Sequence, residues 1–158
     1  MNLHICEVTA SNWRSVAALD VAEEQRQFIE SNAFSLAESL FEGNATSLAL
    51  YDKETLVGYA MYGWYSEKNE SIWLDRFMID YNFQGNGYAK RFLRLLISYL
   101  HQKYQCKRIY LSLHPNNKLA MKLYESFGFR LTGDIDDEGP VVGVVMELLL
   151  DKVTPCIK

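Results

Sequence analysis

The residues best suited to chemistry form a short glycine-containing stretch, Gln84-Gly85-Asn86-Gly87-Tyr88-Ala89. It follows an apolar segment typical of a strand, and the residues after it place apolar side chains every three or four positions, as on one face of a helix. Glycine tolerates a positive φ and leaves the backbone uncovered, so successive amide N–H groups can converge on an anion at the positive end of a helix dipole. The stretch therefore predicts a loop that binds pyrophosphate.

The spacing of residues in and after this stretch excludes two other classes of phosphate-binding loop. A dinucleotide-binding fingerprint needs a third glycine where this chain has Lys90, and an acidic residue about 20 positions later, where it has Cys106-Lys107-Arg108. The nucleoside triphosphate loop needs Gly-Lys-Ser/Thr, which the sequence lacks. The remaining pattern, Gln-x-x-Gly-x-Ala, resembles the acetyl-CoA loop of the GCN5-related N-acetyltransferase (GNAT) family. For the hexapeptide alone, a loop that merely turns the chain stays an alternative.

A second motif lies 40 positions after Gln84. Ala120, Leu123, Tyr124 and Phe127 fall on one helix face, Asn116 or Asn117 can cap that helix, and Gly128 is suited to end it. The pattern Asn-x-x-Ala-x-x-x-Tyr-x-x-x-Gly-Phe is similar to the second conserved block of the same family. The resemblance implies that Asn117 contacts the cofactor and that Tyr124, as general acid, lies beside the thioester sulfur. Considered alone, Tyr124 is more commonly a core tyrosine, as aromatic residues on an apolar helix face usually are.

Further segments resemble one group of enzymes within this family. The segments Trp73 to Asp80 and Cys106 to Ser112, with the loop between them, resemble bacterial spermine/spermidine N-acetyltransferases, and the likeness runs through most of the chain. Ala89 departs from the glycine that the family more often has there. The resemblance implies acetyl-CoA as acetyl donor and a polycationic small-molecule amine as acceptor. It also implies a set of cofactor-binding residues: the backbone of Phe77, Met78 and Ile79, then Gln84, Gly85, Asn86, Gly87, Tyr88, Ala89, Lys90 and Asn117.

Amine acetylation gives Asp75 a candidate catalytic role. An alkylammonium with a pKa near ~10.4 must lose a proton before its nitrogen can attack a thioester. On a regular strand, Asp75 shares a face with Phe77 and Ile79, from which its carboxylate can relay that proton or hold an ammonium. An ion pair with Arg76 or another basic residue is the structural alternative.

The acceptor site is predicted from the N-terminal segment, which in the resembling family covers the acceptor. Glu23, Glu24 and Glu30, with Phe28 between them, supply spaced carboxylates and an aromatic ring for a long polyamine. We predict Glu23, Glu24 and Asp75 as substrate-binding residues. A further four aromatic residues can add apolar surface or simply pack within the sheet: Tyr59, Tyr62, Trp64 and Trp73.

Charge is distributed unevenly along the chain. Residues 1–70 carry 11 acidic and 4 basic side chains, residues 71–133 carry 3 and 10, and residues 134–158 carry 6 and 2. The basic middle third contains both cofactor motifs, whereas the acidic flanks favour a cationic acceptor. A pI of 5.4 without a sustained basic stripe argues against a nucleic-acid partner.

Composition sets further limits. The 158 residues are 49% hydrophobic, which predicts a single domain, 1–158, with one full core. No basic-then-apolar leader and no apolar run of about 20 residues occur, so we expect a cytoplasmic protein without a membrane partner. Cys6, Cys106 and Cys156 are unpaired in spacing, and the three histidines are scattered, which predicts neither disulfides nor a metal site. A homodimer is an open expectation from similar enzymes.

The order of elements predicts a mixed α/β fold. Strands are expected at 3–8, 47–51, 56–64, 72–79, 108–113, 129–132 and 141–150, helices at 13–19, 28–41, 88–103 and 117–126, and an acidic loop at 134–139. This order matches the GNAT acyl-CoA N-acyltransferase fold, a single mixed central sheet flanked by helices with two splayed central strands. Two functional alternatives stay open: acetylation of another amine, such as a protein N-terminus, a lysine, an aminoglycoside or a small toxic amine, and a non-catalytic acyl-CoA sensor.

Overall fold

A computed structural model describes residues 1–150, so the predicted free Cys156 lies outside the described residues. The strands form one seven-stranded sheet in the order β1-β2-β3-β4-β5-β7-β6. Their bounds are Leu3–Glu7 (β1), Ala45–Asp52 (β2), Thr55–Ser66 (β3), Ser71–Ile79 (β4), Arg108–Leu113 (β5), Arg130–Asp136 (β6) and Gly143–Leu149 (β7). All neighbouring strands are antiparallel except β4 and β5, which are parallel. The mixed sheet confirms the predicted fold class.

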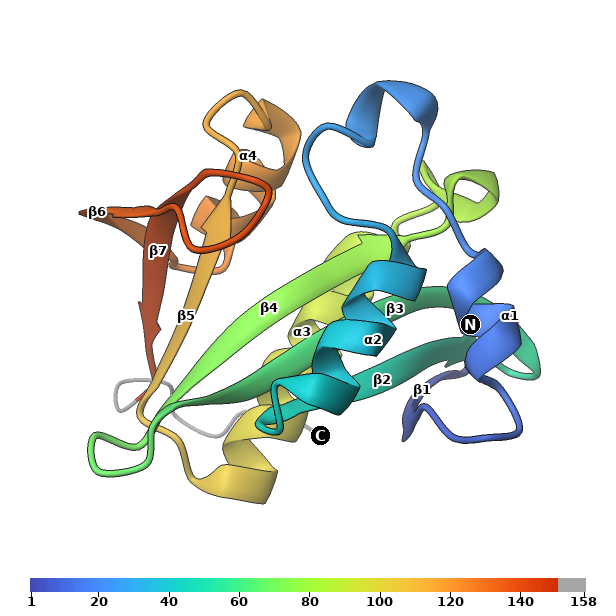
Figure 1. The fold of residues 1–158 in the computed structure, drawn as a ribbon, viewed down its shortest axis with the longest axis horizontal. Helices are drawn as coiled ribbons and strands as arrows, with labels where there is room; N and C mark the ends of the chain where they lie inside the picture. The colour runs from blue at the N-terminus through green and yellow to red at the C-terminus, as the bar shows by residue number, and fades with distance from the viewer. Residues whose placement is uncertain (151–158) are drawn as a thin grey trace.

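Helices cover both faces of the sheet (Figure 1). The α-helices are Trp13–Ala18 (α1), Asn32–Phe41 (α2), Tyr88–Tyr104 (α3) and Lys118–Ser126 (α4), and two short 3₁₀ helices span Glu23–Gln25 (η1) and Tyr81–Phe83 (η2). The larger core packs α3 and α4 on one face, and a smaller core around Val16, Tyr59 and Met78 packs α1 and α2 on the other. No helix among residues 1–150 is long and apolar enough to cross a membrane.

Local signals explain most element ends. Asn117, rather than Asn116, caps α4 by accepting from the Ala120 amide, and Gly128 follows that helix with a φ of +97°. The helix predicted to begin at Phe28 begins at Asn32, because the Ser31 hydroxyl caps it. The predicted acidic loop is wrong at its start, since residues 134–136 extend β6, where Ile135 and Asp136 pair with β7.

The two parallel strands separate after a short contact. β4 pairs with β5 only from Ser71 to Trp73, opposite residues 108–110, and then continues to Ile79 without that neighbour. Figure 1 shows the two strands diverging toward their carboxyl ends. The predicted splay is therefore present, and six residues of β4 beyond Trp73 have no strand paired along that edge.

Candidate active site

A cleft of about 1390 Å³ follows the splay between β4 and β5. It is lined by the loop that leads into α3, by Tyr124 of α4, by the carboxyl-terminal half of β4, and by residues of α2 and the β6–β7 connection. The cleft therefore brings both sequence motifs and much of the acidic flank to one place.

The predicted phosphate loop has an uncovered backbone. Gly85 and Gly87 have φ values of +79° and +80°, and a Cβ on either would meet no atom closer than the Arg91 side chain, 3.9 Å from position 87. No side chain caps α3, and the amide N–H groups from Gly85 to Lys90 donate to no acceptor among residues 1–150. Free amides at a helix N-terminus with open space above them fit a pyrophosphate.

Other predicted cofactor residues are already engaged in internal contacts. Asn86 donates its side-chain amide to Phe83 and Gln84 carbonyls, which holds the loop, and the Tyr88 hydroxyl donates to Asp52 at 2.6 Å. The Asn117 side-chain oxygen is used in the α4 cap. Lys90 is exposed at the edge of the cleft.

Gln84 points away from the loop amides. Its Nε2 donates to the Ile79 carbonyl at 2.9 Å and to Oε1 of Gln25 at 2.8 Å, and the same Gln25 oxygen accepts from the Ala22 amide. The side chain predicted to contact a cofactor therefore ties the phosphate loop to the segment around η1.

A β-bulge alters the faces of β4. In the pairing with β3, Met61 lies opposite Arg76 and the next residue, Tyr62, lies opposite Leu74. Asp75 is therefore an extra residue of β4 with no pairing partner on β3. Phe77 and Ile79 then pack in the α3 core, whereas Arg76 and Met78 face α2. The expectation that Asp75 shares a face with Phe77 and Ile79 is wrong, because the extra residue reverses the alternation.

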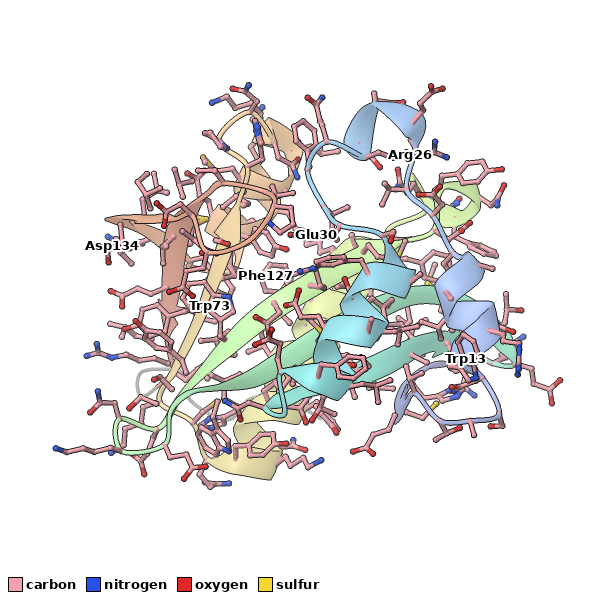
Figure 2. The ribbon with its side chains drawn as sticks, in the orientation of Figure 1. Trp13, Arg26, Glu30, Trp73, Phe127 and Asp134 are labelled. Atoms are coloured by element: carbon pink, nitrogen blue, oxygen red, sulfur yellow. The ribbon has the colours of Figure 1, made fainter. Side chains whose placement is uncertain are left out.

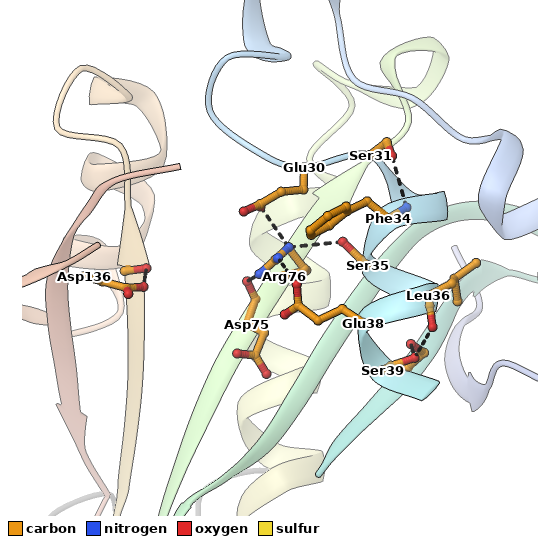
Figure 3. Close-up of polar contacts among 12 residues, drawn as sticks. Glu30, Ser31, Phe34, Ser35, Leu36, Glu38, Ser39, Asp75, Arg76 and Asp136 are labelled. Carbon is orange, nitrogen blue, oxygen red and sulfur yellow. Dashed lines mark hydrogen bonds and ion pairs between the residues drawn. The ribbon is translucent and has the colours of Figure 1, made fainter. Parts of the chain in front are cut away.

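Arg76 is the centre of a half-buried polar cluster. Its guanidinium contacts Glu30 at 3.0 Å, Glu38 at 3.2 Å and the Ser35 hydroxyl at 3.1 Å (Figure 3). It also donates to the Asp75 main-chain carbonyl at 2.9 Å, so the predicted alternative of a side-chain ion pair between Asp75 and Arg76 is not what the structure shows. The cluster fixes Glu30 and Glu38 beside the carboxylate of Asp75, which makes no hydrogen bond or ion pair within the described part of the chain.

The pKa of Asp75 is raised to about 7. Burial is the largest cause, and the carboxylates of Glu38, Asp136 and Glu30 raise it further, while Arg76 opposes them. Asp136 approaches from the opposite wall, where it accepts from the Ser112 hydroxyl at 2.7 Å (Figure 3). A carboxyl with a pKa near 7 can accept a proton at neutral pH and release it again.

Tyr124 lies at the other side of the cleft. Its side chain is 8% exposed, packs against Phe129, and its hydroxyl makes no hydrogen bond to any residue from 1 to 150. Burial raises its pKa above the ordinary value, so the hydroxyl keeps its proton. Tyr124 therefore packs in the larger core and also lines the cleft.

Glu23 and Glu24 do not belong to this arrangement. Both are exposed on η1 and neither lines the cleft. The carboxylates that line the cleft around Asp75 are instead Glu30, Glu38 and Asp136, and the sequence pattern did not single out the last two. Glu38 and Asp136 come from a helix and an edge strand far apart in sequence, and only tertiary packing reveals their proximity. Among residues 1–150 no three His, Cys, Asp or Glu side chains are grouped to hold a metal.

Comparisons with known proteins address the family and the fold of the chain. Residues 11–129 match the model of the acetyltransferase (GNAT) family. The spermine/spermidine N(1)-acetyltransferase of Bacillus subtilis (strain 168) is 40% identical over 149 residues, which cover 91% of this chain and 98% of that relative.

Two solved structures share the fold at low identity. The spermidine N-acetyltransferase from Vibrio cholerae, in complex with CoA and spermine, has a TM-score of 0.77 at 18% identity, covering 96% of this chain and 97% of the other. An acetyl transferase from Salmonella typhimurium that modifies the N-terminal serine of a 50S ribosomal subunit protein has a TM-score of 0.75 at 13% identity, covering 96% of each chain. At these identities the two structures support the fold and do not distinguish between acceptors.

Proposed function

The chain belongs to the acetyltransferase (GNAT) family, and we propose that it transfers the acetyl group of acetyl-CoA to a primary amine of spermine or spermidine. The observation that carries this proposal is the 40% identity with a spermine/spermidine N(1)-acetyltransferase over 91% of the chain. Carboxylates on both walls of the cleft support it, because a polyamine is a chain of cations.

The donor side of the cleft fits acetyl-CoA. This donor supplies an acetyl group activated as a thioester. The free amides from Gly85 to Lys90 bind the pyrophosphate, with the Lys90 ammonium nearby, and the unpaired edge of β4 at Phe77, Met78 and Ile79 binds the pantetheine arm through its backbone. Asn117 supplies its remaining amide group, and Ala89 is the small residue in the first turn of α3.

Asp75 prepares the amine. Its carboxylate, with a pKa of about 7, takes the proton of the acceptor ammonium directly or through a water molecule. The bulge points this carboxylate toward the α2 side of β4, where Glu30 and Glu38 also lie. Asp75 thus acts as general base where neighbouring carboxylates bind the charged parts of the acceptor.

Tyr124 assists the departing sulfur. Its hydroxyl lies in the cleft, is protonated, and is not used by any described residue, so it is available to donate to a thiolate. Because burial makes the hydroxyl a weak acid, its hydrogen bond to the sulfur matters at least as much as complete proton transfer.

Thiol release from acetyl-CoA tests the proposal with spermine, spermidine, short diamines, lysine peptides and aminoglycosides as acceptors. We expect the highest kcat/KM with the two polyamines, and mass spectrometry of the product should show one added acetyl group. Preference for a peptide or an aminoglycoside would assign the chain to another amine. Binding of CoA without turnover of any amine would make it a sensor.

The proposal extends to location and assembly. We propose a cytoplasmic enzyme acting on free polyamine, and a homodimer as its assembly. Light scattering on the purified chain tests the assembly, and a mass of one chain would contradict it.

A further inference from the structure

Three aromatic rings form a continuous surface at the closed end of the cleft. Trp73 and Tyr110 are paired across β4 and β5 at the last position before the strands separate, with ring centroids 6.2 Å apart and planes 13° from parallel. Tyr65 of β3 contacts both, at 5.3 Å from Trp73 and 5.1 Å from Tyr110. We call these three residues the aromatic shelf.

The shelf is open to the cleft. All three residues line it, and the Tyr65 side chain is 61% exposed, an unusual amount for a large aromatic residue that already has two ring partners. Another aromatic cluster, around Tyr62 and Tyr104, closes on itself through a hydroxyl–hydroxyl hydrogen bond of 2.6 Å. Burial in a core therefore does not account for the shelf.

Its position relative to the proposed base suits the remainder of a long acceptor. Trp73 precedes Asp75 by two residues on the same strand, a distance of roughly 7 Å at the usual rise of a strand. Glu42 lines the cleft beside Asn44, whose side chain donates to the Trp64 carbonyl next to Tyr65. When the reacting nitrogen of a long acceptor lies at Asp75, the rest of its chain can extend over the aromatic faces of the shelf and then reach the carboxylate of Glu42.

We propose that the aromatic shelf binds the non-reacting arm of the polyamine and so selects long acceptors over short ones. Methylene groups pack on the ring faces, and an ammonium above a ring gains a cation–π interaction. This inference rests on the proposed function and adds to it the part of the substrate that is not acetylated. Tyr65, Trp73 and Tyr110 are then specificity-determining residues, while Asp75 and Tyr124 carry the chemistry.

Trp73→Leu tests the shelf, with Trp13→Leu as a matched control. Trp13 lies on α1, outside the cleft, on the opposite side of the molecule from Trp73 (Figure 2). We expect Trp73→Leu to raise KM for spermine about tenfold, in line with a desolvated cation–π contact. Its kcat, and the KM for 1,3-diaminopropane, should stay within about twofold of the wild type. The exposed Tyr65→Ala should act in the same direction with little risk to folding.

A direct measurement of binding complements the kinetics. The chain has three tryptophans, so a Trp13→Phe/Trp64→Phe variant keeps Trp73 alone as fluorophore. Spermine added to this variant with CoA should change the Trp73 emission, whereas 1,3-diaminopropane should change it little. This readout does not depend on turnover.

The outcomes separate the two proposals. Equal increases in KM for spermine and the short diamine, or an unchanged emission at saturating spermine, would overturn the shelf while leaving polyamine acetylation intact. A wild type that acetylates only peptides or aminoglycosides would overturn the proposed function. A fall in melting temperature with unchanged KM for spermine would show that the rings serve only packing.

Discussion

At the scale of single residues, we propose that two side chains carry the chemistry, and their surroundings suit them to opposite roles. Burial, together with neighbouring carboxylates, raises the pKa of Asp75 to about 7, whereas burial among apolar groups raises the pKa of Tyr124 and keeps it protonated. One group is therefore ready to accept a proton at neutral pH and the other to donate a hydrogen bond.

Tyr124→Phe removes the proposed donor and almost nothing else. Because the hydroxyl has no partner among the described residues, its loss should leave the melting temperature within about 2 °C of the wild type. We expect kcat to fall about 100-fold, at the lower end of general acid–base effects, with the Kd for CoA unchanged within threefold. Thiol-release assays measure kcat, and calorimetry measures the Kd for CoA. An unaltered kcat would remove Tyr124 from the mechanism.

Asp75→Asn should change the pH dependence of kcat/KM for spermidine. In the wild type Asp75 must be ionised to take the proton of the bound ammonium, so log(kcat/KM) should rise by about one per pH unit below pH 7 and level off above it. The variant lacks the base and needs an acceptor that is already unprotonated, so its log(kcat/KM) should be lower at neutral pH and keep rising by about one per pH unit through pH 7 and above.

Asp136→Asn provides the companion test. Removing this carboxylate takes away one cause of the raised pKa, so the inflection near pH 7 should move to lower pH while the rate at high pH is retained. An inflection that stays in place in Asp75→Asn would show that another group is the base.

At the scale of elements, the segment between α1 and α2 connects the two halves of the site. It is tied to the phosphate loop through Gln25 and Gln84, it packs Phe28 on His114 beyond the end of β5 at 5.2 Å, and it delivers Glu30 to Arg76. This segment therefore contacts the ends of both splayed strands.

Gln84→Met should loosen this connection. It removes both hydrogen bonds that the Gln84 side chain donates, so the segment that carries Glu30 is held less firmly. We therefore expect KM for spermine to rise about fivefold and the Kd for CoA to rise less. Gln25→Glu is the matched control, because only the oxygen of Gln25 is used and a carboxylate can replace it. If Gln25→Glu impairs spermine binding as much as Gln84→Met does, the hydrogen bond is not the cause.

Some of these elements can be predicted from the sequence, and others cannot. The open glycine backbone before α3, the α4 cap and the splay follow from local spacing and from a family pattern, and the structure contains all three. The bulge at Asp75 follows from the pairing of β4 with β3, which no single segment encodes, so the face of Asp75 was predicted wrongly.

Contacts between distant segments explain the other differences. Glu23 and Glu24 have the right residue type in the right region, yet the capped start of α2 brings Glu30 and Glu38 to the cleft instead. Asp136 was assigned to a loop because β6 is a short edge strand with a register shift, which weakens its alternation.

At the scale of the whole molecule, the uneven charge along the chain becomes a charge difference across one cleft. The basic middle third contributes the loop into α3, and both acidic flanks contribute carboxylates, Glu30 and Glu38 from one and Asp136 from the other. An anionic donor and a cationic acceptor are thus attracted to different ends of the same cleft. The cost is that like charges are held close together around Asp75.

That cost should be measurable as a pH dependence of folding. The pKa of Asp75 is higher in the folded protein, about 7, than its ordinary value of 3.8, so the folded state keeps a proton that the unfolded chain releases. The stabilising contribution of this proton is fully present below about pH 4 and is lost as pH rises to 7. Asp75→Asn removes the effect, so its free energy of unfolding relative to the wild type should be higher at pH 8 than at pH 4.5, by about 1–3 kcal/mol after allowance for partial solvent exposure. Urea unfolding at both pH values measures the difference, with the exposed Asp134→Asn as a control that should show none. A difference independent of pH would mean that Asp75 is ionised as readily in the folded protein as in the unfolded chain, and the case for it as a base near neutrality would fail.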